Sequence, residues 1–251
     1  MSKFWNFKAK SETEGELTLY GLISSVSWWG DEITPKQFKK DMDALGDIAN
    51  LNIYINSDGG DVFAGQAIYS MIKRHKAAKT VYIDGLAASI ASLIAMAGDK
   101  VYMPSNAMMM IHNPYTIAIG NSNEFRKLAD DLDKIRESML VTYAAKTGME
   151  QEELIKLLDA ETWLTADDAY TLGFADEIEE QKTIAASLEG GFLMVNNVQM
   201  DLKKYKNAPE IKVSEAKPAE TQPNTEEARL PPVDLYQKVI QTNQRRISAW
   251  N

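Results

Sequence analysis

Serine, histidine and carboxylate side chains that could carry out acyl transfer occur in the middle of the chain. Ser89 follows a β-like run that ends in Asp84-Gly85, and it lies in the small-residue stretch GLAASIAS. If a helix starts there, its unpaired backbone N–H groups can stabilise an oxyanion that develops beside the serine. A serine at a helix start is also a common N-cap, and from this motif alone the cap is the more frequent role.

The two histidines of the chain occupy different kinds of position. His75 lies in KRHK at the end of an expected helix, where a basic residue complements the helix dipole. His112 follows the apolar run MMMI and precedes Asn113-Pro114, so it is expected at the tip of a buried strand and facing a cleft. Taken alone, a half-buried structural histidine is the more frequent reading of such a position.

A third feature is the pair Gly59-Gly60, which ends the β-like run LNIYIN-SD. Glycines allow backbone N–H groups to approach a ligand closely. The stretch does not match the phosphate-binding pattern G-x-x-x-x-G-K-[ST], and we therefore expect no nucleotide there.

Strands and helices alternate along the part of the chain that carries these residues. The longest periodic stretch, Glu124–Tyr143, has apolar residues at steps of three and four, which is typical of a helix. The alternation predicts an α/β fold with largely parallel pairing. Strands are expected at Leu17–Ser24, Leu51–Asn56, Lys79–Asp84, Lys100–Met103, Met108–His112 and Phe174–Ile178, and helices from Thr34-Pro35 and at Val62–His75, Ala88–Ala97, Glu150–Leu158 and Ala166–Leu172.

Composition excludes several classes of function. The net charge of −9 argues against a general nucleic-acid binder, and the absence of cysteine excludes thiol chemistry and cysteine-ligated metals. The N-terminus lacks the apolar region of a secretory signal, and no run of about 18 apolar residues could span a membrane. We expect a cytoplasmic protein with no metal and no cofactor.

Four stretches together resemble the proteolytic subunit of the Clp protease, the ClpP family. They are NSDGGDVFAGQAIY, GLAASIAS, MMMIHNP and ETWLTADDAYTLGFADEI, in that order and at similar spacing. The resemblance covers about Leu17 to Ile178. The stretch WWGDEIT and the long tail look most like the phage-encoded branch of the family, the head maturation or prohead proteases. The implied fold has the repeated ββα units shared with crotonases and a long handle-type helix.

The resemblance implies a role for each candidate site residue. Ser89 corresponds to the nucleophile and His112 to the general base, and the backbone N–H groups of Gly60 and Ile90 correspond to the oxyanion hole. The triad acid falls at Glu161, where the family usually has aspartate, and Asp159 is the alternative. A second departure is Asp58, where the family commonly has proline.

The resemblance and the change in composition after about Lys182 together predict a division of the chain, and the resemblance implies a set of partners. Residues 1–16 form an N-terminal segment, 17–182 a ClpP-like protease domain, 183–206 an extension, and 207–251 a flexible tail rich in proline and charge, with a short helix within Asp234–Trp250. The implied protein assembles into homo-oligomeric rings, as in stacked heptamers. It cleaves protein substrates such as capsid or scaffold proteins, either independently of ATP or assisted by an AAA+ unfoldase. No nucleic acid or membrane is involved.

Two other functions remain open from the residues. A crotonase-like acyl-CoA enzyme would also hold an oxyanion with backbone N–H groups, but it would not require a serine, a histidine and an acid. An inactive relative that serves as an assembly or scaffold component would tolerate the departures at Asp58 and Glu161.

Overall fold

A mixed β-sheet forms the centre of the computed structural model, which describes residues 3–24, 35–181, 186–189, 192–196 and 198–209. Its strands run in the order β1-β2-β3-β4-β5-β8, and β6 pairs with both β4 and β7. All pairings are parallel except β1 with β2 and β6 with β7. The bounds are β1 Trp5–Ala9, β2 Glu14–Tyr20, β3 Asn50–Ser57, β4 Ala78–Ala88, β5 Lys100–Pro104, β6 Met108–Ile111, β7 Thr162–Thr165 and β8 Glu177–Glu179.

Six α-helices accompany this sheet in the described part of the chain, which confirms the expected α/β class. They are α1 Pro35–Asp43, α2 Val62–Arg74, α3 Ile90–Ala95, α4 Ser122–Thr147, α5 Gln151–Asp159 and α6 Ala166–Thr171. Alternate residues of β3, Leu51, Ile53 and Ile55, are completely buried, as expected for a strand whose inner face forms the core. None of the helices in the described ranges is long and apolar enough to cross a membrane.

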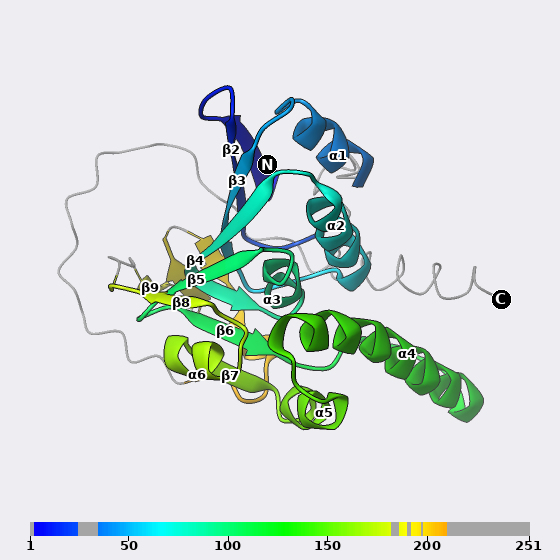
Figure 1. The fold of residues 1–251 in the computed structure, drawn as a ribbon. Coiled ribbons are helices and arrows are strands. Elements are labelled where there is room, and N and C mark those ends of the chain that lie inside the picture. Colours follow the sequence, from blue (N-terminus) through cyan, green and yellow to red (C-terminus); the bar gives the residue numbers. More distant parts are fainter. Residues whose placement is uncertain (1–2, 25–34, 182–185, 190–191, 197, 210–251) are drawn as a thin grey trace.

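The long helix α4 extends away from the sheet (Figure 1). Asn121 and Glu124 form a capping box at its start, and Gly148 ends it in the left-handed conformation. Its buried residues, Met139, Leu140 and Tyr143, all lie in its second half. The first half of α4 therefore contributes no buried residue to the core of the described ranges.

The sheet begins earlier in the chain than the pattern predicts. β1 lies within the stretch assigned to an N-terminal segment before residue 17, but it pairs with β2 over five residue pairs. Phe4 and Trp5 are buried in the core, and Trp5 packs edge-on against Phe38 of α1. Burial of these aromatic side chains holds the first strand in the domain.

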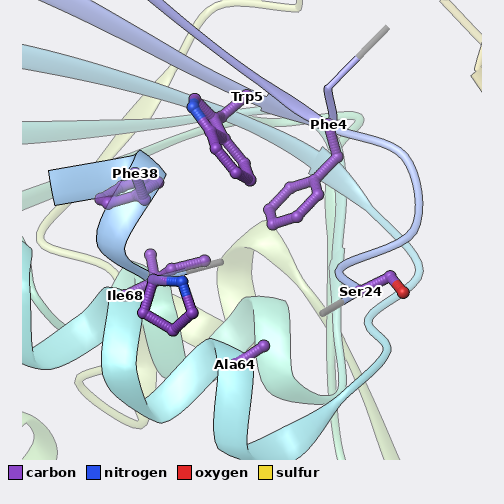
Figure 2. Close-up of a pocket in the computed structure, with 7 residues that line it drawn as sticks. Phe4, Trp5, Ser24, Phe38, Ala64 and Ile68 are labelled. Carbon is purple, nitrogen blue, oxygen red and sulfur yellow. The ribbon is translucent and has the colours of Figure 1, made fainter. Parts of the chain in front are cut away.

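A small apolar pocket lies between β1, α1 and α2 (Figure 2). Its lining consists of Phe4, Trp5, Ser24, Pro35, Phe38, Ala64 and Ile68. Ser24 and Pro35 flank residues 25–34, which lie outside the described residues, so the pocket borders that segment and we assign no ligand to it.

The chain beyond β8 adds a second, three-stranded antiparallel sheet. Its strands are β9 Ala186–Glu189, β10 Phe192–Val195 and β11 Val198–Met200, and a 3-10 turn follows at Leu202–Lys204. An apolar cluster joins it to the main sheet, because Leu193, Val195 and Met200 pack with Leu86 of β4 and Met110 of β6. The extension assigned to residues 183–206 thus packs against the strands that carry Ser89 and His112. The expected tail helix within Asp234–Trp250 lies outside the described residues.

A close contact between α2 and α3 sets the position of the chain at Ser89. A Cβ atom on Gly65 of α2 would lie 2.1 Å from Cγ1 of Ile90, the first residue of α3. Ile90 is completely buried. Only glycine at position 65 allows the two helices to approach this closely.

We expect Gly65→Ala to destabilise the fold by about 1–3 kcal/mol, because the added methyl group overpacks the contact with Ile90. Ile90→Ala removes the side-chain carbons that the new methyl group would meet. The loss of unfolding free energy in the double variant should therefore be smaller than the sum of the losses in the two single variants, by at least about 1 kcal/mol. Urea unfolding of the four proteins measures this coupling. Additive effects would show that the two side chains do not limit the helix approach.

Candidate active site

Three parallel strands bring the predicted site residues to one edge of the sheet. In the register of β3 with β4, Ser57 is opposite Ala87, and in that of β4 with β6, Ala88 is opposite Met110. The Ser89 N–H continues this ladder by donating to the Met110 carbonyl, at 2.8 Å. The glycine turn after β3, the serine after β4 and the histidine after β6 are neighbours because parallel strands end at the same edge.

Ser89 does not serve as a helix cap. Its side chain makes no capping hydrogen bond, and its backbone has φ 56° and ψ −128°. A non-glycine residue with positive φ is strained, and such strain often accompanies functional positions. This conformation directs the side chain to β6, where Ser89 Oγ lies 2.7 Å from His112 Nε2.

His112 is held in the neutral state that can accept a proton. His112 and Ser89 are each only 7% exposed. Burial lowers the pKa of His112 from its ordinary value of 6.5 to about 4, while the charge of Glu161 acts to raise this pKa and that of Lys204 to lower it. At neutral pH the imidazole is therefore uncharged, and Nε2 can accept the hydrogen bond from the Ser89 hydroxyl.

The two candidate acids have different surroundings. Ile111 of β6 is opposite Thr162 of β7, and His112 and Glu161 are the residues next to this last pair. Glu161 also has positive φ, at 49°, and its Oε1 accepts a hydrogen bond from the backbone N–H of Asn207, at 2.6 Å. The charge of Glu161 reaches the imidazole, but its carboxylate is engaged by the C-terminal extension.

Asp159, the alternative acid, ends α5 and faces other partners. Its Oδ1 accepts a hydrogen bond from Asn113 Nδ2, at 2.7 Å, and lies 3.6 Å from the guanidinium of Arg136. Asp159 is not among the charges that affect the pKa of His112. Of the two carboxylates, Glu161 is the one whose charge acts on the pKa of His112.

The glycine turn lies directly against the serine. Gly59 has φ 92°, and a Cβ atom there would lie 2.7 Å from Ser89 Cβ. Gly60 forms a β-bridge with Ile23 in which Gly59 O accepts from Ile23 N and Asp61 N donates to Ile23 O. These bonds do not use the Gly60 N–H. The Ile90 N–H, as the first of α3, has no acceptor within the helix. The Ile90 N–H thus directly follows Ser89, the Gly60 N–H follows the glycine that contacts Ser89, and neither N–H has a partner in these ladders.

Sequence reasoning did not identify Tyr205 and its neighbours as part of this site. The Tyr205 ring packs edge-on against the His112 imidazole, with ring centroids 5.2 Å apart, and its hydroxyl donates to the Asp58 carbonyl. Lys204 Nζ lies 2.8 Å from Asp58 Oδ2. The sequence signal that could have indicated this cationic partner is Asp58, because the family commonly has proline at this position.

The described part of the chain has no cluster of three or more histidine, aspartate or glutamate side chains that could hold a metal ion. The Ser89 hydroxyl contacts the His112 imidazole, whose pKa responds to the Glu161 carboxylate, and the first N–H of α3 directly follows the serine. This set is suited to nucleophilic attack on a carbonyl carbon with transfer of the serine proton.

Comparisons with known proteins match the part of the chain that builds this edge. A sequence model of the Clp protease family matches residues 39–182. The ATP-dependent Clp protease proteolytic subunit of Deinococcus radiodurans is 29% identical over 143 residues, which make up 56% of this chain and 70% of that protein. The matched region contains Gly60, Ser89, Ile90, His112 and Glu161 and ends before Tyr205.

The buried neutral state of His112 predicts a pH effect on stability. Since the pKa of His112 is about 4 in the folded protein against 6.5 ordinarily, the unfolded chain binds more protons between these values. The stabilisation is present above pH 6.5 and is lost as the pH falls toward 4. Between pH 7 and pH 5, the wild type should lose about 2 kcal/mol more of its unfolding free energy than His112→Gln.

Urea unfolding of both proteins at the two pH values measures this difference. The pKa of His75 is also lowered by burial, but His75 and all carboxylates are present in both proteins, so they cancel in the comparison. Equal losses in the two proteins would show that His112 is not buried in the neutral form.

Proposed function

Since the chain belongs to the Clp protease family, a family of peptidases, we propose that it is a serine endopeptidase with Ser89 as its nucleophile. The observation that supports this most strongly is the 2.7 Å contact between Ser89 Oγ and His112 Nε2. Serine is a weak nucleophile unless a neighbouring base takes its proton. His112 is neutral, buried and aimed at the hydroxyl, and therefore meets the requirement for that base.

In the proposed reaction, Ser89 Oγ attacks the carbonyl carbon of a peptide bond as its proton moves to His112 Nε2. The carbonyl oxygen becomes an oxyanion that accepts hydrogen bonds from the N–H groups of Gly60 and Ile90. Collapse of the intermediate breaks the C–N bond, and the imidazolium gives its proton to the leaving amine. Water, deprotonated by His112, then hydrolyses the acyl-enzyme and regenerates Ser89.

We assign the triad acid to Glu161. Its carboxylate is the group whose charge favours the protonated imidazole, which forms after the serine proton has moved. In the described conformation Glu161 Oε1 accepts a hydrogen bond from the Asn207 N–H, and we expect the other carboxylate oxygen to align with His112 Nδ1. The extra methylene of glutamate relative to aspartate provides the reach.

The rival functions fit these residues less well. A crotonase-like enzyme needs the backbone donors but has no use for a serine in hydrogen-bond contact with a buried histidine. An inactive assembly component has no use for the strained Ser89 backbone, whose φ of 56° serves the contact with His112. Strain at a position without function is selected against, since it costs on the order of 1–3 kcal/mol.

We further propose assembly into stacked rings in which α4 contacts the opposite ring. The support is that α4 extends from its domain (Figure 1) and exposes Phe125 and Val141, whereas its buried residues begin only at Met139. A partner helix would cover this apolar surface. We also propose that an AAA+ unfoldase delivers protein substrates to the ring.

We also propose that the protein serves phage head maturation, with capsid or scaffold proteins as substrates. The support is the resemblance of WWGDEIT and of the long tail to that branch. Residues 25–34 and 210–251, which carry most of it, lie outside the described residues.

Ser89→Ala and His112→Ala should each lower the kcat/KM for peptide hydrolysis by at least about 10³-fold, because nucleophile and base act as a unit. For the same reason the double variant should be no slower than either single variant. Ser105→Ala, which removes an exposed serine hydroxyl from the β5–β6 connection, is the matched control and should retain activity. Substantial hydrolysis by Ser89→Ala would contradict the mechanism.

Light scattering of the full chain should give a mass that is a multiple of 28.1 kDa, corresponding to stacked rings. Phe125→Asp places a charge in the apolar ring contact and should reduce this mass to that of a single ring. Tyr170→Asp changes an exposed aromatic on α6 and should not alter the mass. A monomeric wild type at micromolar concentration would count against the ring.

A further inference from the structure

Residues 201–207, which we name the strap, pack against His112 and bond both to the glycine turn and to the segment of Glu161. On the side of the glycine turn, Lys204 Nζ forms an ion pair with Asp58 Oδ2, and the backbone N–H of Asp201 donates to the same oxygen, at 3.3 Å. The Tyr205 hydroxyl donates to the carbonyl of Asp58. Three contacts thus hold the strap to the residue that precedes Gly59-Gly60.

At its other end the strap bonds to the segment of the proposed triad acid. The Asn207 N–H donates to Glu161 Oε1, at 2.6 Å, and its side-chain Nδ2 donates to the Ala160 carbonyl, at 2.7 Å. Asp58 and Glu161 both bond to the strap, and both depart from the residues usual in the family. One short segment therefore contacts both positions at which this chain differs from the family, Asp58 and Glu161.

Between these anchors, Tyr205 covers the reacting groups. Its residue is 6% exposed, and its ring lies edge-on to His112 and to Trp163, with a centroid separation of 5.8 Å to the latter. Burial raises the pKa of the Tyr205 hydroxyl, and the Ser89 side chain acts to lower this pKa. The ring is therefore in contact with the base, and the hydroxyl is close enough to the nucleophile to respond to it.

The strap is held in place by the second sheet. Asn56 Nδ2 of β3 donates to the Val195 carbonyl, at 2.9 Å, and Asn196 Nδ2 donates to the Asp84 carbonyl, at 2.6 Å. Val195, Met200 and Tyr205 belong to the same apolar cluster as Leu86 and Met110. The strap is consequently a packed part of the fold, and it lies outside residues 39–182 that match the family.

We propose that the strap is an intramolecular inhibitor that occupies the substrate cleft and must be displaced before a peptide can reach Ser89. This proposal rests on the proposed function. A peptide carbonyl must lie against Ser89 Oγ and the Gly60 N–H, and this space borders the Tyr205 side chain and the Asp58 turn. Release of the strap also removes the Asn207 hydrogen bond from Glu161, so the same movement opens the cleft and leaves this carboxylate to His112.

The Lys204–Asp58 pair is the contact whose removal should open the strap. The Asp58 side chain is only 6% exposed, and a buried carboxylate that loses its cation is strongly destabilising in the closed state. Opening returns Asp58 to water, so Lys204→Ala shifts the balance toward the open state. Lys203→Ala removes the same charge from the adjacent position, whose side chain is exposed and does not bond to Asp58, and is the matched control.

The first readout needs no enzymatic activity. Diethyl pyrocarbonate modifies accessible neutral imidazoles, and the chain has two histidines, so His75 is an internal reference. The proteins are modified at pH 7.5, and the rate at each histidine is measured by peptide mass mapping. His112 should be modified at least about fivefold faster in Lys204→Ala and in Tyr205→Ala than in the wild type and in Lys203→Ala. The rate at His75 should be the same in all four proteins.

The second readout is hydrolysis of a short unstructured peptide by the same four proteins. Lys204→Ala should raise kcat/KM several-fold over the wild type, and Lys203→Ala should not. Equal modification of His112 in all four proteins would overturn the strap as a cover. Faster modification without faster hydrolysis, in proteins that do hydrolyse the peptide, would overturn its inhibitory role. Faster modification with no hydrolysis by any protein would support the cover and reject the protease function instead.

Discussion

The parallel pairing of β4 with β6 is the constraint on which the site depends. It continues one residue beyond the strands through the hydrogen bond from Ser89 N to Met110 O, and it therefore fixes the distance between the serine and the histidine that follows β6. The short contact between Ser89 Oγ and His112 Nε2 requires in addition the strained backbone at Ser89. Gly59 leaves room for that backbone, because a Cβ atom in its place would collide with Ser89 Cβ. Packing of Ile90 against Gly65 then holds the start of α3 in register with the strand edge.

The C-terminal extension adds a second layer of control to the same edge. Asp58 and Glu161 both bond to the strap, which supplies a lysine to the first and a backbone N–H to the second. Burial under Tyr205 keeps His112 neutral, which suits a general base, but it also removes the space that a substrate needs. The features that prepare the base and those that exclude the substrate thus come from one segment of chain.

Much of the fold and part of the site could be predicted from the sequence. Alternating strand and helix patterns predicted the α/β class, and the four resembling stretches pointed to the family to which the chain belongs. The pattern missed β1, because its five residues are held by burial of Trp5 rather than by a distinct alternation. From the local sequence Ser89 looked like an N-cap. Its positive φ could not be predicted, because it accompanies pairing with β6, which the local sequence does not specify. Tyr205 could not be placed, since its bond to Asp58 joins residues 147 positions apart and depends on the path of the second sheet.

Activation of Ser89 by His112 is tested most directly by mapping the adduct of a fluorophosphonate, a reagent that traps a serine nucleophile as its phosphonyl ester. The full wild-type chain and His112→Gln would be incubated over hours, and the modified residue and its rate of formation would be read by mass spectrometry. An activated nucleophile predicts a single adduct on Ser89, formed at least about 10²-fold more slowly in His112→Gln. An adduct on another serine, or an equal rate at Ser89 in the two proteins, would contradict it.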